Sequence, residues 1–119
     1  MNYIKLNELA AQAMGMDPNM DYLTAINTGG VTRKWNPCED LNDASALLEK
    51  VANGRFWELN ARTAPVSKYD AAKPYYCRVG TEEGATWSNS ETATLAMTLC
   101  ALRASGIPDS SITEAQEII

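Results

Sequence analysis

Residues 33–43 read RKWNPCEDLND, and they mark the point where an expected strand passes into an expected helix. Pro37 disfavours helical backbone at Asn36, so a helix can begin only after this point. Asp40 or Asn42 can then accept hydrogen bonds from the free amides of the first helical turn. Apolar residues follow on one helical face: Leu41, Ala44, Leu47, Leu48 and Val51. The stretch therefore predicts a helix N-terminus near the middle of the chain.

The same stretch places Cys38 beside acidic residues. A thiol at a helix N-terminus can have a lowered pKa, whereas the adjacent Glu39 and Asp40 act in the opposite direction. The chain contains no histidine, which excludes Ser-His-Asp and Cys-His catalysis and histidine metal sites. Negative charge at this position is explained by the helix dipole alone. We therefore interpret the stretch as a structural joint, with no catalytic residue, and keep a cysteine- or carboxylate-dependent enzyme as the second alternative.

Patterns on either side of the joint predict further elements. Apolar spacing of three and four residues predicts a helix over 4–14, ended by a glycine. Segments 22–26 and 31–35 flank a Gly-rich turn and are expected to be strands. Alternating large side chains predict strands over 55–62 and 74–80.

The last third of the chain is expected to add a short strand and a helix. Residues 85–87 follow a Glu-Glu-Gly turn signal and supply the strand. Ser88 and Glu91 form a capping-box pattern just before the apolar helix over 93–104. The predicted fold is α+β, with three helices packed on a mainly antiparallel sheet of three to five strands. We assign residues 1–106 to a single domain and 107–119 to a C-terminal tail or short helix.

A family resemblance sharpens this fold class. The joint Trp35–Asp40, the helix after it, the aromatic strands and the stretch Ser90–Leu102 resemble the phage ABA-sandwich domain family and the NinX-like small phage proteins, over roughly residues 3–106. Two departures are Pro37-Cys38-Glu39 at the joint and Thr94 where those proteins often have proline. The resemblance implies an α-β-α layered sandwich and a small phage or prophage accessory protein. It brings no catalytic residue with it.

Composition restricts the setting of the protein. The chain has 119 residues, 45% of them apolar, which suits one soluble domain. Its net charge of −5 opposes general nucleic-acid binding. The N-terminus lacks a secretory signal and no long apolar run is present, so we expect the cytoplasm of a bacterial host cell and no membrane. The three cysteines have no CxxC spacing, which favours reduced thiols over disulfides or a zinc site. We expect neither a metal nor a cofactor.

Aromatic and arginine residues supply the candidate binding site. They lie on or beside the expected strands, and we select Tyr22, Trp35, Trp57 and Trp87 together with Arg33 and Arg55. Such a set can stack a base and hold a phosphate, or form the centre of a protein interface. The alternative is that most of the rings cover the sheet beneath the helices. Trp35 and Trp87, each near the end of an element, are expected at the rim of a site.

These observations predict a non-enzymatic binding protein. The first hypothesis is a phage protein that binds a host protein, including one from an antiviral defence system. The alternative is a module that sequesters a small nucleotide-like signal. A homo-oligomer is expected, because a small chain can cover an exposed sheet edge or apolar helix flank by self-association.

Overall fold

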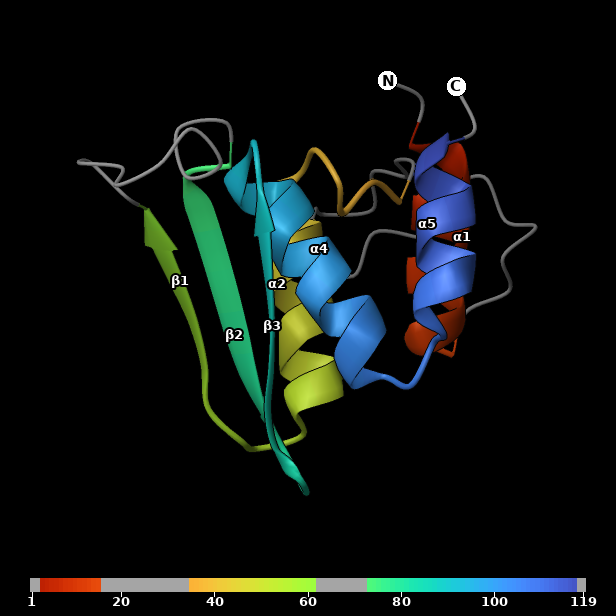
Figure 1. Cartoon of the computed structure of the whole chain (residues 1–119). Coiled ribbons are helices and arrows are strands. Elements are labelled where there is room, and N and C mark those ends of the chain that lie inside the picture. The colour runs from red at the N-terminus through yellow and green to blue at the C-terminus, as the bar shows by residue number, and fades with distance from the viewer. Residues whose placement is uncertain (1–2, 16–34, 62–72, 118–119) are drawn as a thin grey trace, which may run out of the picture.

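The computed structural model describes residues 3–15, 35–61 and 73–117, which form an α+β fold (Figure 1). Within these described ranges, one antiparallel sheet in the order β1-β2-β3 is combined with four helices. The helices are α1 (Ile4–Ala13), α2 (Leu41–Ala52), α4 (Ala93–Ala104) and α5 (Asp109–Glu117), and the strands are β1 (Trp57–Ala61), β2 (Tyr75–Thr81) and β3 (Gly84–Ser90). The class is the expected one, with one helix more than the three predicted.

The additional helix is α5. It lies in residues 107–119, for which the sequence predicted either a tail or a short helix. Its first turn begins at Pro108, whose carbonyl accepts hydrogen bonds from the amides of Ser111 and Ile112 at 3.0 and 3.2 Å. Ile112 and Ala115 are buried, and α5 packs against α1 and α4. Residues beyond Gly106 therefore contribute to the core.

The layers run in a different order from the predicted α-β-α sandwich. Helices α2 and α4 pack directly on the sheet, and α1 and α5 pack on the side of these helices away from it (Figure 1). Within the described residues the sheet is thus an outer layer. The strands allow this because their two faces differ. Cys77, Val79 and Ser88 are buried toward the helices, whereas the side chains at alternate positions lie on the solvent side of the sheet and contact one another there.

The predicted N-cap of α2 is confirmed at Asp40. The side chain of Asp40 accepts a hydrogen bond from the amide of Asp43 at 3.0 Å, which begins α2. The helix ends at Asn53, which has a left-handed backbone with φ of 50°.

The predicted capping box before α4 is wrong. Thr92 caps this helix by accepting from the amide of Leu95 at 3.2 Å. Ser88 and Ser90 instead belong to β3, where Ser90 pairs with Tyr75. The strand is longer than the expected 85–87 because its pairing with β2 continues to the last residue of the hairpin. Ser88 and Ser90 are therefore in a strand, because pairing with β2 outweighs a local pattern that favours a helix start.

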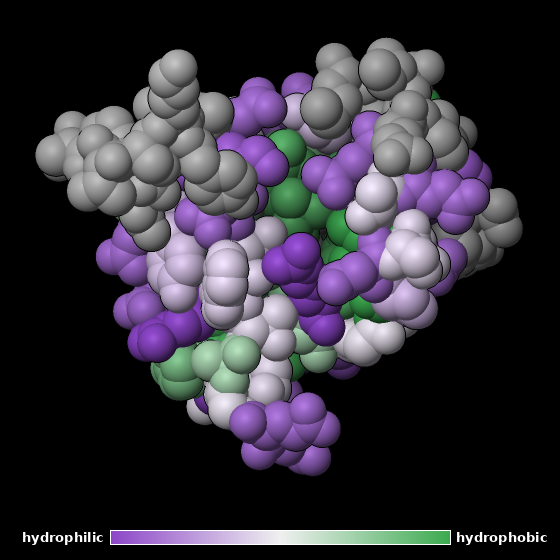
Figure 2. Space-filling model, in the orientation of Figure 1, coloured by the Kyte–Doolittle hydropathy of each residue, from purple (hydrophilic) through white to green (hydrophobic). Residues whose placement is uncertain are grey.

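The core is centred on α4. Its residues from Leu95 to Leu102 are all buried, between the sheet on one side and α1 and α5 on the other. On the side of the molecule seen in Figure 2, green apolar surface is gathered in a recess between the sheet and α5, with hydrophilic side chains around it. The described helices include none with the length and hydropathy to cross a membrane. The expected strands over 22–26 and 31–34 lie outside the described residues, and Trp35 belongs to no strand.

Candidate functional site

The candidate site is the outer face of the sheet, by which we mean the side turned away from the helices. Its side chains come from alternate strand positions and from the residue before β1: Phe56, Glu58, Tyr76, Arg78 and Trp87. Across the three strands, Glu58 lies opposite Arg78 and Arg78 lies opposite Trp87. The pleat therefore brings residues from three strands into one row.

Arg78 occupies the centre of this row. Its guanidinium carbon lies 5.1 Å from the centroid of the Phe56 ring, which is cation–π distance. Its Nε lies 3.0 Å from Oε1 of Glu58, an ion pair without hydrogen-bond geometry. The positive charge is thus held between a ring and a carboxylate, and the centre of the face has little net charge.

Phe56 lies over the backbone of β2. A Cβ added to Gly80 would come within 2.8 Å of the ring atom Cε1, so only glycine leaves room for the ring in this position. The amide of Gly80 also donates to the carbonyl of Phe56 at 2.8 Å. Sequence reasoning did not select Phe56, although a glycine inside a predicted strand is the usual signal for such a close approach.

Tyr76 and Trp87 form the second aromatic contact of the outer face. Their ring centroids are 6.0 Å apart and the ring planes are inclined by 32°. Trp87 is 52% exposed and Phe56 is 50% exposed, so two large apolar side chains on one face are open to solvent. Side chains of this kind are enriched at the centres of protein interfaces.

The structure divides the predicted site residues. Trp87 lies on the outer face. Arg55 lies beside Phe56, and its guanidinium forms an ion pair with Glu82 at 3.5 Å. Trp57 is on the opposite side of β1 and packs partly buried against the core. Tyr22 and Arg33 lie outside the described residues.

Trp35 does not share a rim with Trp87. It is only 6% exposed and belongs to the hydrophobic core. Its indole nitrogen has no hydrogen-bond partner among the described residues. The prediction of an exposed Trp35 is wrong. Residues that follow it in the joint are hydrogen-bonded to α1 and α4, and this holds Trp35 in the core.

Hydrogen bonds from α1 and α4 hold this joint. Asn7 donates from Nδ2 to Oδ1 of Asn36 at 3.0 Å and accepts the amide of Cys38 at its own Oδ1 at 3.3 Å. The hydroxyl of Thr94 donates to the carbonyl of Cys38 at 2.6 Å. Asp43 accepts the amide of Asn36 at 3.0 Å. The polar groups around Cys38 are therefore engaged with the backbone.

The Cys38 thiol is 2% exposed, and burial raises its pKa to about 12. The charge of the nearby Glu39 contributes to this rise, and a hydrogen bond with Thr98 lowers the pKa without cancelling it. At neutral pH the group is the protonated thiol, which is a poor nucleophile. The pKa of Cys77 is also raised, first by a hydrogen bond with Cys100 and then by burial.

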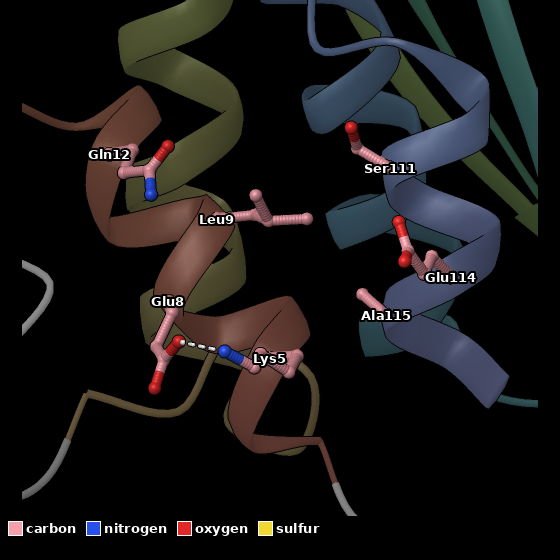
Figure 3. A pocket seen from close by; sticks show the side chains of 7 residues that line it. All are labelled: Lys5, Glu8, Leu9, Gln12, Ser111, Glu114 and Ala115. Carbon is pink, nitrogen blue, oxygen red and sulfur yellow. Dashed lines mark ion pairs between the residues drawn. The ribbon is translucent and has the colours of Figure 1, made fainter. Parts of the chain in front are cut away.

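A groove lies between α1 and α5 (Figure 3). It has a volume of about 420 Å³ and is lined by Lys5, Glu8, Leu9, Gln12, Ser111, Glu114 and Ala115. Lys5 and Glu8 form an ion pair at 3.5 Å across one turn of α1. The part of the chain that the structure describes has no group of three or more Cys, Asp and Glu side chains suited to a metal ion.

No protein-family model matches the chain, and no curated protein matches it. The fold is similar to that in the 2.0 Å crystal structure of a phage protein from Bacillus cereus ATCC 14579. The TM-score is 0.61 at 20% sequence identity, over 87% of this chain and 92% of the other. The two proteins share a fold.

Proposed function

We propose that this chain is a small phage or prophage accessory protein that binds a host protein through the outer face of its sheet, without catalysis, in the bacterial cytoplasm. The phage origin is supported by the fold of the Bacillus cereus phage protein and by the resemblance to the ABA-sandwich and NinX-like families. The binding role depends on one observation, the pair of exposed rings Phe56 and Trp87 on a sheet face that no described helix covers.

The contacts within the outer face suit protein recognition. Interface hot spots are enriched in Trp, Tyr and Arg, and all three are present here in Trp87, Tyr76 and Arg78. Arg78 is already held by the Phe56 ring and Glu58, so binding would cost less side-chain entropy than for a free arginine. Exposed ion pairs such as Arg55–Glu82 then form a polar rim.

The nucleotide-like ligand is the weaker candidate for this face. A phosphate would need an available guanidinium, but Arg78 and Arg55 each lie beside a carboxylate, at 3.0 and 3.5 Å. Glu58 and Glu82 would also repel the negative charge of a phosphate. A partner with mixed polar and apolar surface meets neither obstacle.

The enzyme alternative gains no support from Cys38 or from the two carboxylates at the start of α2. The Cys38 thiol is protonated at neutral pH because burial raises its pKa. Asp40 accepts the amide of Asp43, and Asp43 accepts the amide of Asn36, so both carboxylates serve the helix start. A non-catalytic role is therefore the better proposal.

Affinity capture from lysate of a host strain tests the proposal when wild type is compared with two variants. Trp87→Thr removes the exposed ring while keeping a strand-forming residue. Leu41→Thr is the matched control, because Leu41 is 55% exposed but lies on α2. We expect one host protein to be retained by wild type and by Leu41→Thr and lost with Trp87→Thr.

The captured protein then has to be tested in purified form. Calorimetric titration should show that Trp87→Thr weakens binding by about 30-fold or more, as for the loss of a hot-spot ring. Equal affinities for wild type and Trp87→Thr would refute a binding role of the outer face. If the partner belongs to an antiviral defence system, the same variant should fail to inhibit that system.

A further inference from the structure

The free edge of β1 presents unpaired backbone groups. The amide of Gly80 bonds to the carbonyl of Phe56, and hydrogen-bonded pairs alternate along an antiparallel ladder. The N–H and C=O groups of Glu58 and Asn60 therefore point toward β2, and those of Trp57, Leu59 and Ala61 point away from the sheet. None of the described residues bonds to these outward groups.

The inner side of β1 is also poorly covered. Trp57 and Leu59 are only partly buried, whereas Val79 and Cys77, which lie opposite them on β2, are completely buried. Figure 1 shows the reason, because β1 lies at the edge of the sheet farthest from the helices. Apolar side chains and backbone polar groups are thus left open along the same strand.

The opposite edge of the sheet is blocked. The backbone groups of Arg78 face β1, so the pair Arg78 and Trp87 is not hydrogen-bonded and the carbonyl of Trp87 points to the free edge of β3. Arg103 covers this edge by donating from a terminal nitrogen to that carbonyl at 3.0 Å. Asp109 holds the guanidinium in place at 3.3 Å. Charged side chains at an edge oppose the addition of another strand.

We propose that β1 is the dimerisation strand and pairs antiparallel with β1 of a second copy of this chain. The twofold axis passes beside Leu59, so Leu59 lies opposite Leu59 of the second copy and Trp57 lies opposite Ala61. These are the residues whose backbone groups point outward, and each opposing pair can exchange N–H···O bonds. The two sheets then become one continuous sheet.

Side-chain complementarity selects this register. With Leu59 at the axis, Glu58 lies opposite Asn60 of the second copy, and a carboxylate meets an amide that can donate to it. Shifting the pairing by two residues in one direction places Glu58 opposite Glu58 of the second copy, and the two negative charges repel each other. Shifting it in the other direction leaves Trp57 opposite no residue of β1. A register shifted by one residue would place Trp57, Leu59 and Ala61 opposite residues whose N–H and C=O groups point to their own β2, so these inter-chain bonds could not form.

Dimerisation at this edge is independent of the proposed host protein. It would bury more of Trp57 and Leu59 on the inner side of the strand. It would also place the outer faces of both copies side by side, since they belong to one sheet. The dimer requires only the contacts of β1 and would form in the purified chain.

Two proline substitutions at matched edge positions test the proposal. Ala61 and Ala85 are both exposed, and the amide of each points to a free edge, that of β1 and that of β3 respectively. Proline removes the amide without breaking a bond inside the sheet. Sedimentation equilibrium should show a dimer for wild type and Ala85→Pro. Ala61→Pro should weaken association at least about tenfold, with an unchanged circular dichroism spectrum.

Charge at position 60 tests the register with variants that leave the backbone intact. Asn60 is exposed, and both substitutions keep its strand position. Asn60→Asp should weaken the dimer and Asn60→Lys should strengthen it, with dissociation constants differing about tenfold because the contact occurs twice. A monomeric wild type, dissociation caused by Ala85→Pro and not by Ala61→Pro, or equal dissociation constants for the two Asn60 variants would overturn the proposal.

Discussion

The ring of Phe56 lies over Gly80 so closely that a Cβ at position 80 would come within 2.8 Å of its Cε1. The same ring carries the guanidinium of Arg78 at 5.1 Å. A single glycine in β2 therefore allows the arrangement of the outer face.

Gly80→Ala should displace the Phe56 ring and lower the free energy of unfolding by about 1 kcal/mol, the lower end of overpacking costs, because an exposed ring can move. Urea unfolding measures the loss. In a Phe56→Ala background the same substitution should cost much less, since nothing then occupies the space. An equal cost in both backgrounds would show that the ring is not the cause.

The contact between Thr94 and the joint makes a second prediction. Thr94→Val removes the hydroxyl that donates to the buried Cys38 carbonyl at 2.6 Å, and should cost about 1–2 kcal/mol of unfolding free energy. Thr94→Ser keeps the hydroxyl and should cost less in the same thermal or urea denaturation. If Val and Ser variants were equally stable, the bond would contribute nothing to the joint.

The cap of α2 gives a third prediction. Asp40→Ala leaves the amide of Asp43 without its acceptor and should lower the free energy of unfolding by about 1 kcal/mol. Asn is as good an N-cap as Asp, so Asp40→Asn should retain most of the stability. Chemical denaturation of both variants separates the cap from the charge, and an Asn variant as unstable as the Ala variant would point to the charge.

Short-range physics explains which features the sequence predicted. Asp40 as a cap depends on a few neighbouring residues, and β1 and β2 follow from alternation within each strand. The outer face depends on which side of the sheet the helices cover, and single-strand patterns do not decide this. Phe56 gains its role from Gly80, a residue of another strand, so its importance could be seen only once the register was known.

Long-range packing explains the failures. Trp35 is buried because Asn7 and Thr94 fasten the joint after it to α1 and α4, contacts that no local pattern reveals. The local pattern at Ser88 and Ser90 favours a helix start, yet both residues pair with β2 as part of β3. Residues 109–117 are polar overall and gain their helix from two buried side chains, Ile112 and Ala115, packed on the earlier part of the chain.

The buried thiol of Cys38 predicts how stability changes with pH. Its pKa rises from an ordinary value of 9.0 to about 12 in the folded chain, mainly through burial. Above pH 9 the unfolded chain loses this proton while the folded chain keeps it. The unfolded state then binds fewer protons, so the free energy of unfolding falls as pH rises from about 9 toward 12.

Replacing the thiol should remove part of this pH dependence. Cys38→Ala should give a flatter decline of stability between pH 9 and 12 than wild type, measured by urea unfolding in a pH series, even if it is less stable at pH 7. Cys77→Ala is the internal comparison, because the pKa of Cys77 is raised as well and its loss should flatten the curve in the same direction. Iodoacetamide should label native Cys38 slowly at neutral pH. Fast labelling of Cys38 in folded protein, or a pH profile unchanged by Cys38→Ala, would contradict a protonated thiol and reopen its role as a nucleophile.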